Sequence, residues 1–116
     1  AMSKPERALE LCNEIDGARV APAVLFEARI VGAGALGDLD RTDEAIAMLE
    51  SLPLDAETAE EHHVRAWYAL GDLLERKGRF TQARSMFEAV VDADPELTDA
   101  HERISGSRLR ERGSGR

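Results

Sequence analysis

The sequence has few of the residues that stabilise small non-helical folds. Its 116 residues include one cysteine, one tryptophan and one tyrosine, and aromatic residues make up only 4% of the chain. The single cysteine, Cys12, excludes an internal disulfide and a cysteine-rich zinc site. Scarce aromatic residues beside abundant alanine favour closely packed helices over a β-sandwich or a barrel.

Long apolar runs and positive charge are also lacking. No apolar run approaches the roughly 20 residues that cross a membrane, and no signal-peptide pattern is present. The chain has 15 basic and 23 acidic residues, a net charge of -8. Such a charge argues against a nucleic-acid module, because those modules bind largely by neutralising phosphates. We therefore expect a cytoplasmic protein with neither a nucleic-acid nor a membrane partner.

The clearest pattern lies between residues 63 and 95, and it predicts a helical hairpin. Lys77-Gly78 is a good helix stop between two apolar stripes, and Asp94-Pro95 ends the second stripe and opens another helix. Both stripes have the spacings of three and four that are typical of an amphipathic helix. They consist of Ala66, Trp67, Leu70, Leu73 and Leu74, and of Ala83, Met86, Phe87, Val90 and Val91. Gly71 lies inside the first stripe, where glycine costs about 1 kcal/mol, and it indicates a close crossing by a neighbouring backbone.

This hairpin resembles the tetratricopeptide repeat (TPR) family. The residues that match the family's pattern of large, small and breaker positions are Trp67, Leu70, Gly71, Gly78, Phe80, Ala83, Phe87 and Pro95. The resemblance implies an all-α fold of antiparallel hairpins, stacked as a short right-handed solenoid with a C-terminal capping helix. It extends to the C-terminal repeat segments of longer bacterial TPR proteins of unassigned role.

Weaker copies of the hairpin precede it. Ala8, Ala45 and Ala83 occupy equivalent positions, at intervals of 37 and 38 residues. We expect one repeat domain over residues 1–105 and a flexible basic tail over 106–116. The expected parts of the domain are a half-repeat at 3–16, hairpins at 22–52 and 57–93, and the capping helix at 95–105. The half-repeat leaves a helix face uncovered, so either more chain precedes it or that face forms a homodimer.

Helix starts are expected at three polar clusters. Ser3 to Glu6 and Thr58 to Glu61 both read as capping boxes, and the second predicts a helix that starts at Ala56 or Thr58. Thr81 is expected to cap the second helix of the clearest hairpin.

Residues 32–37 read GAGALG, a GxGxxG motif, and Asp55 lies near the position of a ribose-binding acid. That motif requires a preceding strand and a helix that starts within it. Here the turn at Asp40-Arg41 follows at once, and no later segment reads as a parallel strand. We interpret these glycines as positions of close helix crossing, and a dinucleotide-binding enzyme remains a remote alternative.

No cofactor, metal site or catalytic group is expected. His62 and His63 are adjacent, so on a helix their side chains point about 100° apart and chelate one ion poorly. No arrangement of serine, histidine and acid stands out. The arginines near the C-terminus are read as a solvated basic end.

The resemblance to TPR proteins implies a concave surface lined by the first helix of each hairpin. If Trp67, Leu70 and Leu74 face the core, the same helix offers five polar side chains to a partner. These are Arg65, Tyr68, Asp72, Glu75 and Arg76. Relatives that bind chaperone tails use lysine and asparagine at such positions, so a co-chaperone role is not expected. We expect a non-catalytic protein-protein interaction module that binds a peptide or a partner helix. The alternative is a dimerisation module of a larger protein.

Overall fold

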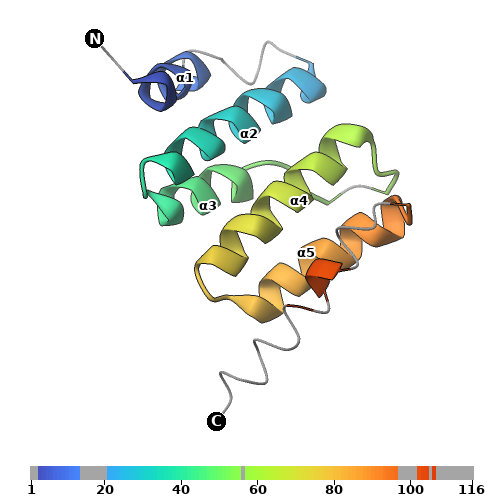
Figure 1. Cartoon of the computed structure of the whole chain (residues 1–116). Helices are drawn as coiled ribbons and strands as arrows, with labels where there is room; N and C mark the ends of the chain where they lie inside the picture. Colours follow the sequence, from blue (N-terminus) through green and yellow to red (C-terminus); the bar gives the residue numbers. More distant parts are fainter. Residues whose placement is uncertain (1–2, 14–20, 56, 97–101, 105, 107–116) are drawn as a thin grey trace. The chain divides into compact units, whose positions relative to one another are not determined.

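The regular structure of this chain is helical. The computed structural model describes residues 3–13, 21–55, 57–96, 102–104 and 106, and within them no strand occurs. The helices are α1 (Lys4–Asn13), α2 (Pro22–Asp38), α3 (Thr42–Glu50), α4 (Glu61–Arg76) and α5 (Phe80–Ala93) (Figure 1). This confirms the predicted all-α class. The side chain of Cys12, most of the expected capping helix and the arginines after residue 106 lie outside the described part.

The contacts divide the chain into two compact units, Ala1–Ala56 and Glu57–Arg116. In the first unit α1 packs on α2, and α2 packs on α3 (Figure 1). Its buried apolar side chains are Phe26, Ala28, Ala33, Ala35, Leu36, Ala45, Ile46, Leu49 and Leu52. The expected cap at Ser3 is present, because the Glu6 backbone N–H donates to the Ser3 hydroxyl at 3.3 Å.

The GAGALG segment lies inside α2, which runs without interruption from Pro22 to Asp38. A dinucleotide loop needs a strand before it and a helix that begins within it, so this segment does not have the geometry of that motif. The close-crossing interpretation holds only in part. Gly32 is buried, but Gly34 is exposed, and a Cβ built on it meets nothing within 4 Å.

The second unit contains the hairpin that the sequence shows most clearly. α4 and α5 lie side by side and antiparallel (Figure 1). Its buried apolar side chains are Ala66, Leu70, Leu73, Leu74, Ala83, Phe87 and Val90. Trp67 departs from the expectation, because it is only half-buried and its ring centroid lies 6.0 Å from that of His63.

Gly71 is needed for close packing in this hairpin. A Cβ built on Gly71 would lie 2.9 Å from two ring atoms of Phe87. The expected close approach is therefore real, but the neighbour is an aromatic ring and not a backbone. Phe87 itself is fully buried, so its ring has little space to move away.

Two helix starts differ from the sequence expectation. α4 begins at Glu61, later than expected, because the Glu60 backbone N–H is satisfied by His63 Nδ1 at 3.0 Å. α5 begins at Phe80, so Arg79 and not Thr81 holds the N-cap position. Gly78 adopts the left-handed conformation, with φ 81°, and this reverses the direction of the chain. The next helix then begins two residues later, at Phe80.

The two hairpins share one turn geometry. The Arg41 N–H donates to the Leu36 carbonyl at 2.8 Å, and the Arg79 N–H donates to the Leu74 carbonyl at 2.9 Å. In both turns the residue before the arginine has a positive φ, 60° at Asp40 and 81° at Gly78. This is the six-to-one bond of a Schellman cap. Each member of one turn lies 38 residues before its counterpart, the same interval as between Ala45 and Ala83.

Candidate functional site

The five candidate partner-binding residues lie on one side of α4. Their spacing of three and four residues aligns them along the helix. Arg65 and Arg76 are exposed, whereas Tyr68, Asp72 and Glu75 are half-buried. Arg76 pairs with Asp72 at 2.9 Å. The two ends of this face are therefore open to solvent, and its middle is already in contact with other protein groups.

The group that covers the middle is Arg103, which belongs to a short helical turn at residues 102–104. One terminal nitrogen of its guanidinium donates to Asp72 Oδ1 at 2.7 Å and to Glu75 Oε1 at 2.9 Å. The other donates to the Tyr68 hydroxyl at 3.3 Å. Three of the five candidate residues thus converge on one cation.

The rings of Phe87 and Tyr68 pack against this cation, and we call them the aromatic floor. The guanidinium carbon of Arg103 lies 4.7 Å from the ring centroid of Phe87 and 5.6 Å from that of Tyr68. The two rings meet edge to face, with centroids 5.5 Å apart. Both distances from the cation are within the range of a cation–π interaction. Because Gly71 has no side chain, Phe87 can approach α4 closely enough to form this floor.

The surroundings of Arg103 keep it charged. Partial burial of the guanidinium disfavours its charged form, but the hydrogen bonds that it donates to Asp72, Glu75 and Tyr68 outweigh that effect and raise the pKa of Arg103 above its ordinary value. Only 21% of the Arg103 side chain is exposed. The contact is therefore a partly desolvated ion pair, in which the attraction between the charges has to offset the cost of withdrawing them from water.

Arg103 was not among the residues that the sequence singled out. One signal could have found it, because Arg103 follows Ala100 by three residues and precedes Ile104. Within the expected capping helix at 95–105, Leu97, Ala100 and Ile104 have the spacing of an apolar stripe, so Arg103 falls at the border of that stripe. An arginine at such a border can lay its aliphatic stem on apolar surface and direct its guanidinium toward polar groups.

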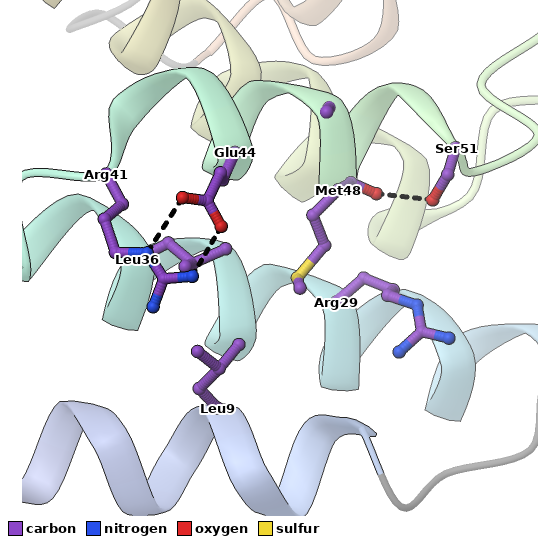
Figure 2. Close-up of a pocket in the computed structure, with 8 residues that line it drawn as sticks. Leu9, Arg29, Leu36, Arg41, Glu44, Met48 and Ser51 are labelled. Atoms are coloured by element: carbon purple, nitrogen blue, oxygen red, sulfur yellow. Dashed lines mark hydrogen bonds and ion pairs between the residues drawn. The ribbon is translucent and has the colours of Figure 1, made fainter.

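The first unit has an open depression of about 480 Å³ between α1, α2 and α3. Figure 2 shows Leu9 of α1 facing Leu36 and the Arg41–Glu44 pair. Arg41 Nε donates to Glu44 Oε1 at 2.9 Å, and this hydrogen bond raises the pKa of Arg41 and lowers the pKa of Glu44. A carboxyl group with a lowered pKa is a poor general acid near neutral pH.

Among the described residues, no group of three or more histidine, cysteine, aspartate or glutamate side chains could hold a metal ion. His62 and His63 lie with their ring centroids 4.3 Å apart. In the part of the chain that the structure describes, no helix is long and apolar enough to cross a membrane.

Comparison with known proteins gives a family for this chain. Residues 38–102 match the model of the tetratricopeptide repeat family. That stretch covers more than half of the chain and contains α3, α4 and α5. No curated protein matches the sequence significantly. The chain belongs to the tetratricopeptide repeat family, whose members generally mediate protein-protein interactions.

Proposed function

We propose that this chain is a non-catalytic interaction module that binds a peptide or a partner helix on the face of α4 defined by Arg65, Tyr68, Asp72, Glu75 and Arg76. The observation that supports the proposal is the continuity of this face over three turns of one helix. Family membership supports a protein partner in general.

The chemistry of the α4 face suits a polypeptide with charges of both signs. The guanidinium groups of Arg65 and Arg76 lie at exposed positions, and they flank the carboxylates of Asp72 and Glu75. Interfaces of this kind gain orientation and specificity from complementary charges, and they gain affinity from a few anchors. Tyr68 is the aromatic anchor in the middle of the face.

The proposal includes no catalytic group, no cofactor and no nucleic acid. A net charge of -8 opposes contact with phosphate backbones. We also propose a cytoplasmic setting, which suits a chain whose single cysteine supports no disulfide framework.

The test selects peptides from a random library on the immobilised full chain and then measures their affinity for two variants. We expect Arg65→Gln to weaken binding by about tenfold or more, since charged hydrogen bonds contribute about 1.5–3 kcal/mol. The thermal midpoint should stay close to that of the unmodified chain, because Arg65 is exposed.

The matched control is Gln82→Glu, which makes the same change of net charge at an exposed position on α5. This control should bind the selected peptides as the unmodified chain does. Selected peptides that bind Arg65→Gln without loss, or that lose affinity equally for both variants, would show that the α4 face is not the binding surface.

Self-association is the second candidate function, and one observation favours it. Val24 and Val31 are 49% and 45% exposed, and they lie seven residues apart on the same side of α2. A second copy of the chain could cover this apolar pair. A dimer that persists on dilution in light scattering would favour self-association, and a monomer would favour the peptide-binding module.

A further inference from the structure

The chain fills the middle of the α4 face with one of its own arginines. We propose that Tyr68, Asp72, Glu75 and Phe87 form an arginine receptor, which Arg103 occupies in cis and an arginine of a peptide partner occupies in trans. This inference rests on the proposed function, because the partner would bind the same face of α4. It adds the chemistry of the partner, an arginine-bearing peptide, and a competitor within the chain.

The geometry of the receptor fits a guanidinium better than an ammonium ion. Three hydrogen bonds leave the two terminal nitrogens of Arg103, at 2.7 and 2.9 Å to the two carboxylates and at 3.3 Å to the Tyr68 hydroxyl. The guanidinium carbon also lies 4.7 Å from the Phe87 centroid. A planar group with five N–H donors can satisfy these contacts together, whereas lysine brings a compact charge without a planar face.

All four receptor residues belong to the hairpin of α4 and α5. The packing of these two helices therefore brings the receptor residues together without a contribution from the backbone around Arg103. Asp72 is also held by Arg76 at 2.9 Å. Phe87 is fully buried and rests against Gly71. These contacts preorganise the receptor, and preorganisation lowers the cost of binding a new ligand.

An emptied receptor would favour another cation. With Arg103 in place, Asp72 is 30% exposed and Glu75 is 14% exposed, and the guanidinium balances the charge of both carboxylates. Removal of Arg103 takes a positive charge from between them, and the remaining negative charge beside the aromatic floor attracts a replacement. Arg103 is covalently tethered to the receptor, and a short tether acts like a ligand at about millimolar concentration. A peptide in trans therefore has to compete with Arg103.

The test uses the full chain with Arg103→Gln and the acetylated, amidated peptide ERISG, which has the sequence of residues 102–106. Binding is followed by NMR titration, which measures millimolar affinities. We expect this variant to bind ERISG about tenfold or more tightly than the unmodified chain does, because the cis competitor is gone. The same peptide with lysine in place of arginine should bind about tenfold or more weakly. Adding Glu75→Gln to the variant should weaken ERISG binding by about tenfold or more.

Several results would overturn the arginine receptor. The first is that Arg103→Gln binds the arginine and lysine peptides equally well. The second is that the unmodified chain and Arg103→Gln bind ERISG equally well. The third is that Arg103→Gln does not bind ERISG although its circular dichroism matches that of the unmodified chain. If Arg103→Gln loses its helical signal, Arg103→Lys replaces it, with a smaller expected gain in ERISG binding because the tethered lysine is a weaker competitor than arginine. Loss of the helical signal in both variants would also overturn the proposal, because the receptor would then depend on Arg103.

The outcome separates this inference from the proposed function. Library peptides that bind through Arg65 but keep their affinity when their arginines are replaced by lysine would support the interaction module and contradict the arginine receptor. Peptides whose affinity depends on an arginine and on Glu75 would support both.

Discussion

The contact between Gly71 and Phe87 links core packing to the candidate site. Phe87 is fully buried in the hairpin, and the same ring lies 4.7 Å beneath the guanidinium of Arg103. Any side chain on Gly71 would push against this ring, because a Cβ there would be 2.9 Å from it. One glycine therefore affects both the stability of the hairpin and the position of the aromatic floor.

We expect Gly71→Ala to lower the free energy of unfolding by up to about 2 kcal/mol. Overpacking a core costs about 1–3 kcal/mol, and the better helix propensity of alanine returns up to about 1 kcal/mol. Urea denaturation followed by circular dichroism measures the change.

The control for this substitution is Gly34→Ala in α2. Gly34 is exposed, and a Cβ there meets nothing within 4 Å. Only helix propensity changes at this position, so we expect a stabilisation of about 0.5–1 kcal/mol. If Gly71→Ala were as stable as Gly34→Ala, the close contact with Phe87 would be wrong.

Sequence alone predicted the importance of Gly71 but not the surroundings of Tyr68. A glycine within an apolar stripe is costly, so its presence indicates a packing constraint. Periodicity, however, reports which face of a helix a residue occupies and not what lies against that face. Arg103 is 35 residues from Tyr68 in the sequence, and no local pattern connects the two.

At the scale of elements, the two hairpin turns are copies of one another. Asp40 and Gly78 occupy the same position, and both have a positive φ. Aspartate tolerates this conformation better than most residues other than glycine, whereas a β-branched side chain is strongly disfavoured there. The backbone geometry explains why the first repeat can use an aspartate where the second has glycine.

This equivalence gives a prediction for Gly78. No atom lies within 4 Å of a Cβ built on Gly78, so a substitution there changes only backbone strain. We expect Gly78→Asp to lower the free energy of unfolding by about 1 kcal/mol or less, because aspartate already adopts this conformation at Asp40. We expect Gly78→Val to lower it by about 2 kcal/mol. Thermal unfolding of the two variants measures both values. An equal cost for aspartate and valine would contradict the equivalence of the turns.

The ends of helices were harder to predict than their existence. The stripes of α4 and α5 were visible because each repeats every three or four residues. The start of α4 was not, because Thr58, Glu60 and Glu61 are all acceptable near a helix N-terminus. The hydrogen bond from the Glu60 N–H to His63 decides among them, and competition of this kind is not visible in a pattern of residue types.

At the scale of the whole molecule, the repeat pattern explains why much of the fold could be predicted from the sequence. Each hairpin buries its own apolar stripes, so the contacts that determine it are close in sequence. The family match over residues 38–102 agrees with this reading. The identity of the partner could not be predicted in the same way. It depends on surface side chains, which can vary without changing a repeat fold.

The most direct test of the proposed binding face is an NMR titration of the isotope-labelled full chain with its tightest library-selected peptide. We expect the largest shifts at Arg65, Tyr68, Asp72, Glu75 and Arg76, together with a change in the side-chain Nε signal of Arg103 as the peptide displaces it. Shifts confined to exposed positions of α5 such as Gln82 and Glu88, with α4 and Arg103 unchanged, would contradict the account.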